Sequence, residues 1–143
     1  MLVQQILTNK PGGVVTIAPG ATLREAVDLL AARRIGAVVV SADGRRVAGI
    51  VSERDVVREL GKRGTACLDE TVDRVMTRAI YGCAPTDTAD HVLEQMTRRR
   101  FRHMPVMEGE AMVGLISIGD VVAARLAELQ MERDALTGMI MGN

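Results

Sequence analysis

Two short segments of this chain place a serine and an aspartate in the same frame. Residues 49–55 read GIVSERD and residues 114–120 read GLISIGD, so each is glycine, two apolar residues, serine, two further residues and aspartate. A serine three residues before an acidic residue is typical of a helix start, where the hydroxyl accepts a hydrogen bond from a free N–H of the first turn. A helix start also attracts phosphate, and a carboxylate there can accept hydrogen bonds from the two hydroxyls of a ribose. Each motif is therefore either a helix cap or part of a nucleotide site.

The two motifs lie within a longer internal repeat. When Pro19 is aligned with Pro85, the chain continues without gaps and Thr22 falls on Thr88. Apolar residues then recur in both copies at the i, i+3, i+4, i+7 spacing of an amphipathic helix. These residues are Leu23, Ala26, Val27 and Leu30 in the first copy and Ala89, Val92, Leu93 and Met96 in the second. The repeat predicts the same order of elements twice.

Short apolar runs between turn signals predict the remaining elements. After each amphipathic helix, two strands are expected: 37–40 and 47–51 in the first copy, 103–106 and 112–116 in the second. A lead-in segment and a strand should precede each helix: 3–8 and 14–17 in the first copy, 72–77 and about 79–83 in the second. The helix after the first motif should begin near residue 53 and end near Gly61.

The predicted fold is a mixed α/β (α+β) architecture in which a β-α-β-β-α unit occurs twice with pseudo-two-fold symmetry. We place the first repeat at residues 1–66, the second at 67–127, and a C-terminal helical extension and tail at 128–143. A unit of about 60 residues buries little of its own surface, so the two should pack as one body. The apolar stripe of the C-terminal helix could cover that body or a second subunit.

Composition argues against several classes of function. The formal net charge is zero, which disfavours a general nucleic-acid binder. No run approaches the roughly 18 apolar residues of a membrane span. No export signal is evident, so Cys67 and Cys83 are expected to be reduced thiols in a cytoplasmic protein. Only Tyr81 and Phe101 are aromatic, so a planar ligand should be held mostly by aliphatic side chains.

Residues 1–127 resemble a pair of cystathionine-beta-synthase-type (CBS) domains, the arrangement called a Bateman module. The resemblance rests on VMT (75–77), TLREAVDLL (22–30), RHMPV (102–106) and the two Gly-x-x-Ser-x-x-Asp motifs. It implies tandem CBS repeats with two clefts that bind adenosine nucleotides (AMP, ADP or ATP) or S-adenosylmethionine, with no cofactor required. It also implies a homodimer and a regulatory, non-catalytic role as an energy or metabolite sensor that acts on an effector protein of unknown identity.

The resemblance also implies roles for individual residues. The aspartate of each motif, Asp55 or Asp120, should bind ribose hydroxyls, and the serine, Ser52 or Ser117, should lie near phosphate. The predicted nucleotide-binding set also includes Arg54 and Thr16. Arg102 and His103 complete it.

The two clefts should be unequal. In the family, each cleft takes its aspartate from one repeat and part of its basic phosphate contacts from the other. Asp55 should then share a cleft with Arg102 and His103, whereas the counterparts of that pair in the first copy are Gly36 and Ala37. A phosphorylated ligand should therefore fill the cleft of the first motif more tightly.

Other classes of function have weaker support in the sequence. No nucleophile–base–acid grouping and no His/Cys/Asp metal cluster is evident, so an enzyme is the least favoured alternative. A structural or protein-interaction module with degenerate nucleotide sites is the main alternative. An RNA-associated protein would use the basic run 98–102, but cations also suit the C-terminal end of a helix.

Overall fold

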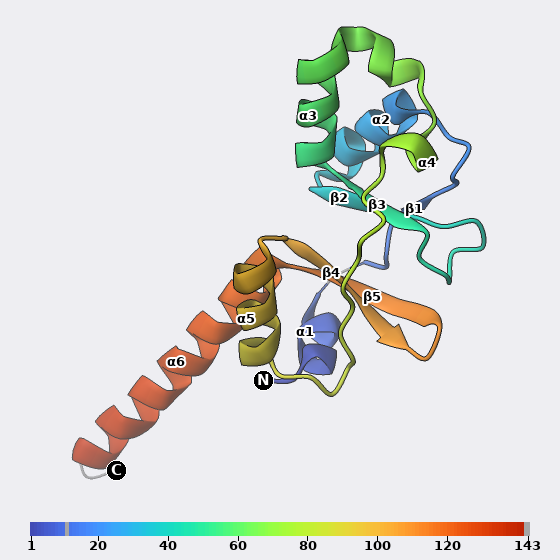
Figure 1. Cartoon of the computed structure of the whole chain (residues 1–143). Helices are drawn as coiled ribbons and strands as arrows, with labels where there is room; N and C mark the ends of the chain where they lie inside the picture. The colour runs from blue at the N-terminus through green and yellow to red at the C-terminus, as the bar shows by residue number, and fades with distance from the viewer. Residues whose placement is uncertain (11, 142–143) are drawn as a thin grey trace.

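The chain forms two lobes joined through their strands (Figure 1), and the computed structural model describes residues 1–10 and 12–141. The elements follow the predicted repeat in the order α1 (Val3–Asn9), β1 (Thr16–Ile17), α2 (Leu23–Arg33), β2 (Ala37–Val40), β3 (Gly49–Ser52), α3 (Glu53–Arg63), the 3₁₀ turn η1 (Gly64–Asp69), α4 (Val72–Val75), α5 (Ala89–Arg99), β4 (His103–Glu108), β5 (Ala111–Ser117) and α6 (Ile118–Ile140). The lobes meet through a small apolar cluster made by Ala37, Val39, Ile50 and Met112.

The first repeat folds around a three-stranded sheet of order β1-β2-β3. β1 pairs parallel with β2, and β2 pairs antiparallel with β3. All four residues of β2 are buried, as expected for a strand with a neighbour on each side and apolar groups on both faces. The sheet ends at Ser52, where α3 begins, so the first motif spans a strand and a helix start.

The second repeat has a smaller sheet than expected. β4 and β5 pair antiparallel with His103 opposite Ser117, but the strand predicted around residues 79–83 is reduced to a single parallel bridge between Cys83 and Val106. The prediction of a full strand there is wrong. Glycine and proline flank Cys83 closely, as Gly82 and Pro85, and both residues weaken a strand.

The predicted end of α3 near Gly61 is also wrong. The helix runs through Gly61 to Arg63, and Gly64 with a φ of +65° ends it. A glycine within a helix costs only about 1 kcal/mol. Arg63 offsets part of that cost because its guanidinium pairs with Glu59 at 2.9 Å and with Glu70 at 3.0 Å.

The two lead-in helices pack on opposite lobes from their own repeats. α1 contributes Val3 and Ile6 to the core of the second repeat, and α4 contributes Val72 and Val75 to the core of the first. Figure 1 shows the exchange, with α4 in the upper lobe beside α2 and α1 in the lower lobe beside β5. Each core therefore includes a segment that lies outside its own β-α-β-β-α unit.

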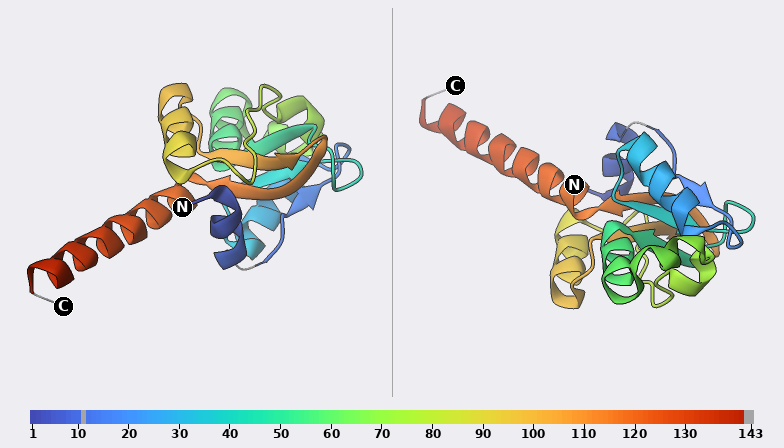
Figure 2. Two further views of the ribbon diagram at one scale, coloured as in Figure 1. Left: turned by 90° about the horizontal axis from the view of Figure 1, so that it is seen from below. Right: turned by 90° about the horizontal axis from the view of Figure 1, so that it is seen from above.

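The last helix, α6, projects from the body for much of its length (Figure 2). Its first turns bury Val121 and Ala124 against the second repeat. The helix and its end also expose large apolar side chains, which are Val122, Leu126, Leu129, Met131, Leu136, Met139, Ile140 and Met141. Among the residues described, no helix is both long enough and apolar enough to cross a membrane.

Candidate functional site

Two clefts of similar size lie where the repeats meet. One cleft of about 350 Å³ contains Asp55, and we call it the Asp55 cleft. The other, of about 390 Å³, contains Asp120, and we call it the Asp120 cleft. Both volumes fall in the range of roughly 300–1,000 Å³ that is typical of small-molecule sites. Gly36 and His103 line both clefts, so the two sites share a boundary.

The Asp55 cleft combines the motif of the first repeat with the start of β4 in the second. Its lining includes Ser52, Arg54 and Asp55 on one side and Arg102 and His103 on the other. These five residues were selected from the sequence, and the fold brings them into one cavity. They meet because β3 ends at the start of α3 beside the turn that leads from α5 into β4.

The carboxylate of Asp55 is buried and fully engaged within the protein. Asp55 is 3% exposed. Its Oδ2 accepts the N–H of Ser52 at 2.8 Å and the Ser52 hydroxyl at 3.1 Å. Its Oδ1 accepts Arg58 at 2.8 Å and the Thr77 hydroxyl at 3.1 Å. A carboxylate offers about four lone-pair sites, so a ribose hydroxyl would have to replace a donor such as Arg58 or Thr77, which both line the cleft.

The Asp120 cleft has the reciprocal composition. Ser117 and Asp120 come from the second repeat, and Gly36 and Ala37 come from the first. Gly36 and Ala37 stand where the other copy has Arg102 and His103, so the first repeat supplies no counterpart of those two side chains, although His103 itself also lines this cleft.

Lys10 and Arg34 nevertheless bring positive charge to the Asp120 cleft, which the sequence analysis did not anticipate. Lys10 Nζ donates to Asp120 Oδ2 at 2.8 Å and to the Leu115 carbonyl at 2.9 Å. Burial opposes ionisation of Asp120, but hydrogen bonds from Lys10 and the Ser117 N–H hold its pKa below the usual value. Among the described residues, Oδ1 of this carboxylate has no hydrogen-bond partner, so it is the oxygen available to a ligand.

Both serines act as helix caps. Ser52 Oγ accepts the N–H of Asp55 at 3.4 Å, and Ser117 Oγ accepts the N–H of Asp120 at 3.1 Å. Each aspartate in turn accepts the N–H of its serine, which completes a capping box. The capping interpretation of the motif is confirmed at both sites, and any role in ligand binding is additional to it.

The glycine of each motif makes room for a lead-in segment. A Cβ at Gly49 would overlap Met76 Sδ and lie 2.6 Å from Met76 Cγ, and a Cβ at Gly114 would lie 2.7 Å from both Leu7 methyl carbons. From the sequence, each glycine was expected to let a ligand or a neighbouring backbone approach closely. The structure places an apolar side chain from the lead-in segment of the other repeat over each one.

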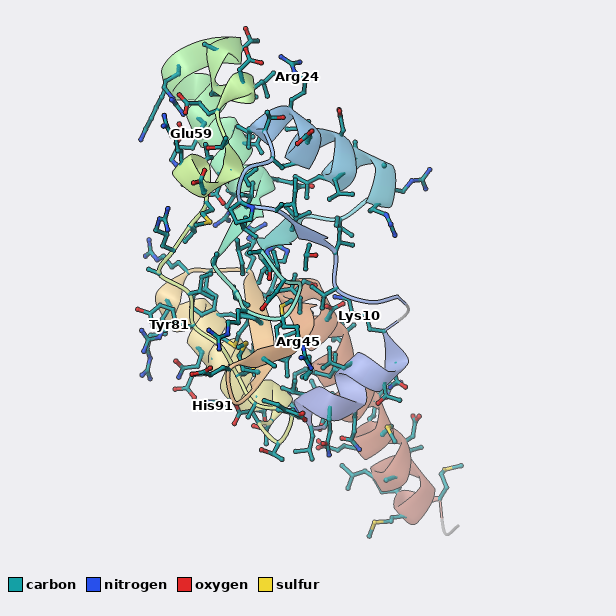
Figure 3. All side chains as sticks on the ribbon, turned by 90° about the vertical axis from the view of Figure 1, so that its right-hand side faces the viewer. Lys10, Arg24, Arg45, Glu59, Tyr81 and His91 are labelled. Atoms are coloured by element: carbon teal, nitrogen blue, oxygen red, sulfur yellow. The ribbon has the colours of Figure 1, made fainter. Side chains whose placement is uncertain are left out.

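A planar ligand was expected to be held mostly by aliphatic side chains, but the aromatic side chains gather in one of the clefts. Both aromatic residues of the chain, Tyr81 and Phe101, line the Asp55 cleft. Their rings stack with centroids 5.5 Å apart at 14°, and the Arg99 guanidinium lies 3.9 Å from the centroid of the Tyr81 ring. Tyr81 and Lys10, one from each cleft, lie on opposite sides of the molecule in Figure 3. The sequence could not pair the two rings because they lie 20 positions apart.

His103 separates the two clefts and is partly buried. Burial lowers the pKa of His103, Lys10 and Arg102 lower it further, and Asp120 and Glu53 oppose the shift. The imidazole is therefore neutral at pH 7 in the absence of a ligand.

One candidate from the sequence falls outside both clefts. Thr16 lies in β1 and lines neither cavity, whereas its neighbours Val14 and Val15 line the Asp120 cleft. The cleft residues that sequence reasoning missed are Lys10, Arg34, Arg58, Thr77, Tyr81, Arg100 and Phe101. Thr77 could have been selected from the sequence, because it is the last residue of the VMT segment on which the family resemblance rests.

No metal chemistry is evident in residues 1–10 and 12–141, where no group of three or more His, Cys, Asp or Glu side chains could hold an ion. Both cysteines are free and buried. Burial, and then Asp87, raise the pKa of Cys83 to about 12, so this thiol is unreactive at neutral pH.

Two matches to one family model follow the repeat. The model described as CBS domain matches residues 3–62 and again residues 72–127. The chain belongs to the CBS-domain family. Its two matches make it a CBS pair, or Bateman module, as the sequence resemblance implied. Each match joins a lead-in helix to the repeat that follows it in sequence, although in this CBS pair the helix packs on the other lobe.

Relatives of the CBS pair are known in plants and prokaryotes. The mitochondrial CBS domain-containing protein CBSX3 of Arabidopsis thaliana is 33% identical over 125 residues, which cover 85% of this chain and 61% of the relative. This chain therefore spans less than two thirds of that protein. The structure of the CBS-domain containing protein ATU1752 from Agrobacterium tumefaciens is 44% identical with a TM-score of 0.83, and the match covers 87% of this chain and 99% of that one.

A second similar structure contains a ligand. The CBS domain protein PAE2072 from Pyrobaculum aerophilum, complexed with AMP, is 28% identical with a TM-score of 0.74. The match covers 84% of this chain and 89% of that one. It is a CBS protein of the same fold and comparable extent.

Proposed function

We propose that this CBS pair is a regulatory module that binds adenosine nucleotides in its two clefts. The observation that carries the proposal is the reciprocal construction of the clefts. Each joins a capped Ser–Asp motif of one repeat to residues of the other, and cations line both. A carboxylate for a diol and cations for phosphate are the two charges that recognition of a nucleotide needs.

Within the Asp55 cleft, Asp55 binds the ribose hydroxyls after Thr77 or Arg58 moves aside, and Ser52 lies near phosphate. Arg54, Arg102 and the imidazole of His103 bind the phosphate. The PAE2072 complex supports AMP, ADP or ATP as the class of ligand, since that relative holds AMP on the same fold.

Within the Asp120 cleft, the free Oδ1 of Asp120 binds the diol and Ser117 is the matching cap. S-adenosylmethionine suits this cleft better than the other, because the cleft has fewer cations and the ligand carries a positive sulfonium. No catalytic group and no further cofactor is part of the proposal, and the output of binding is a change in contacts with an effector protein.

A homodimer is part of the same proposal, and α6 is its main support. Leu126 and Ile140 on this helix are 59% and 84% exposed, respectively. Symmetric pairing is the commonest way for a soluble chain to bury such a surface. Light scattering at tens of micromolar protein should give twice the chain mass of 15.4 kDa, and a monomer mass would contradict it.

We further propose that this CBS pair is a cytoplasmic protein. The mitochondrial relative makes fractionation of the source cells the direct test of this location.

A structural module with degenerate sites is the second candidate, and one observation favours it. The carboxylate of Asp55 already has four donors, as a purely structural aspartate would. Thermal denaturation with AMP, ADP, ATP, S-adenosylmethionine and NADH separates the two functions. A ligand at 100 times its Kd adds about 2.7 kcal/mol to the free energy of unfolding, or roughly 5–10 °C in Tm for a chain of this size. A flat response to all five ligands at millimolar concentration would favour the structural module.

A further inference from the structure

The exposed apolar side chains of α6 follow the spacing of a coiled coil. Most of them recur along the helix at alternating steps of four and three residues, with one arginine at an intervening step. Such a 3.5-residue spacing defines the a and d positions of a heptad, which face a second helix. We call these residues the α6 seam, and they are Leu126, Arg133 and Ile140 at a and Val122, Leu129 and Leu136 at d.

The seam lies on a side of α6 that the body leaves free. Val121 and Ala124 are the residues of this helix that are buried against the second repeat. Because an α-helix turns by about 100° per residue, these two lie roughly 130° around the helix from the centre of the seam. Figure 2 shows α6 standing clear of the body for much of its length. A second helix can therefore follow the seam from the body to the tip without displacing α6 from its own repeat.

The outer half of the seam lies beyond the CBS pair itself. The second family match ends at residue 127, whereas α6 continues to Ile140. Leu129, Leu136 and Ile140 are 49%, 60% and 84% exposed on this extension. A row of large apolar side chains in contact with water is unfavourable, and such a surface marks a site of protein contact.

The charges beside the seam suit a second copy of the chain in parallel orientation. In a parallel pair, each g position faces an e position of the other helix. The e positions are neutral, namely Ala123, Gln130 and Thr137, so no like charges meet there. An antiparallel pair that overlaps the whole seam would instead set Glu132, at g, against the partner's Glu132. The charge pattern therefore favours the parallel pair.

Arg133 interrupts the apolar seam, and a parallel partner would supply its counter-ion. In the single chain, Arg133 Nε lies 3.9 Å from Oδ1 of the adjacent Asp134, and both side chains are more than 70% exposed. In a parallel pair, a residue at a lies beside the g residue of the other helix, so Arg133 meets the partner's Glu132. The aliphatic part of Arg133 can cover the seam while its guanidinium reaches that carboxylate. A single charged residue at a weakens a coiled coil but fixes its register.

We propose that α6 pairs in parallel with α6 of a second copy of this chain, as a two-stranded coiled coil along the α6 seam. Each Arg133 binds the partner's Glu132. The inference rests on the homodimer of the proposed function and identifies the surface and the orientation through which it forms.

Substitutions at d test the contact surface. Leu129→Glu and Leu136→Glu each set two like charges against one another in the pair, and should raise the Kd of dimerisation by about 100-fold or more. Sedimentation equilibrium over a range of protein concentrations measures this Kd. Met131→Glu is the matched control, because Met131 is 67% exposed on the far side of the helix from the seam and should leave the dimer unchanged. Circular dichroism checks that all three variants are folded.

Charge exchange tests the register. Arg133→Glu and Glu132→Arg each replace an attractive pair with a repulsive one, and each should weaken the dimer by about 10-fold. The double variant restores opposite charges and should recover most of the affinity, which a double-mutant cycle would show as coupling between the two positions.

A cysteine in the seam tests the orientation. In a parallel pair, Leu136→Cys faces its own copy and should form an intermolecular disulfide under mild oxidation, whereas the native Cys67 and Cys83 are buried. Failure of this cross-link in a protein that is otherwise a dimer would overturn the parallel arrangement.

The mass measurements separate this inference from the proposed function. If Leu129→Glu and Leu136→Glu both remain dimers, the α6 seam is not the interface, and the proposed homodimer forms through another surface. If the unmodified protein is a monomer, both the inference and the proposed homodimer are wrong, and the seam is left to a different partner. Titration of the unmodified protein with AMP tests the nucleotide function independently of either result.

Discussion

The Asp55 cleft and the Asp120 cleft are copies of one backbone arrangement, yet their aspartates are held differently. Asp55 is buried under four donors, including the hydroxyl of Thr77 from the lead-in of the second repeat. Asp120 has an oxygen without a partner in the described residues, and it is paired instead with Lys10 from the lead-in of the first repeat. The lead-in segments thus set how accessible each carboxylate is, although they lie outside the motif itself.

The walls of the two clefts also differ at equivalent positions of the repeat. Tyr81 and Phe101 line the Asp55 cleft, and the residues 66 positions earlier, Val15 and Ile35, line the Asp120 cleft. The caps are shared by both copies, whereas rings and cations near the motif are not. The repeat therefore fixes the frame of each site, and the substitutions within it give the two clefts different linings.

The largest effect should come from removing the two motif aspartates. Asp55→Ala leaves Arg58, Thr77 and the Ser52 N–H without their acceptor, and should lower the free energy of unfolding by about 2–3 kcal/mol. The loss is not larger because Arg58 is half exposed and can turn to water. Asp120→Ala should cost about 1 kcal/mol, because its carboxylate has fewer donors and more exposure. Urea denaturation of both variants measures the difference. Equal losses would show that the two carboxylates play the same structural part.

Substitution of the motif glycines should also destabilise the first motif more than the second. Gly49→Ala places a methyl against Met76 near its backbone end, with Cβ at 3.0 Å, and should destabilise the fold by about 1–3 kcal/mol. Gly114→Ala meets the methyl ends of Leu7 and should cost less, because that side chain can rotate away. A double-mutant cycle of Gly49→Ala with Met76→Ala should show a coupling energy that favours the double variant. Additive losses would contradict the packing of the lead-in on the glycine.

Replacing the aromatic side chains of the Asp55 cleft with their counterparts in the Asp120 cleft should make the ligand affinities of the two sites more alike. The Tyr81→Val and Phe101→Ile double variant should bind adenosine ligands in the Asp55 cleft about 3- to 10-fold more weakly, because an aromatic contact is worth about 0.5–1.5 kcal/mol. Calorimetry with AMP measures this change. Val15→Ile in the Asp120 cleft is the matched control, with no change expected in the Asp55 cleft.

The smallest effect should be the pH dependence that His103 adds. Burial lowers the pKa of His103 in the folded state below its ordinary value of 6.5, so protons favour the unfolded chain. The contribution of His103 to stability is complete above pH 6.5 and decreases as the pH falls below that value. His103→Gln should flatten the stability profile in the pH window just below 6.5. An unchanged profile in that window would show that the pH dependence of stability comes from other groups.

Sequence periodicity was enough to predict most of the elements because the apolar spacing recurs in both copies. It predicted α2 and α5, the paired strands and the two capped motifs. Lys10 could not be predicted as a cleft residue, because its position depends on α1 crossing to the second repeat. The rings of Tyr81 and Phe101 meet only after the chain folds, since each follows the local pattern of its own element. The end of α3 was misplaced because Gly61 is only a weak helix breaker. The two ion pairs that Arg63 forms, with Glu59 and Glu70, stabilise the turn that follows Gly61.

The central claim is that the two clefts bind adenosine nucleotides with unequal affinity, and calorimetry with AMP tests it most directly. The unmodified protein should show two phases with Kd values at least about 10-fold apart, since Arg54 and Arg102 add charge-assisted contacts only in the Asp55 cleft. Arg102→Ala should abolish the tight phase and leave the weak one. Absence of any binding heat at millimolar AMP, or a single phase that Arg102→Ala does not change, would contradict the account.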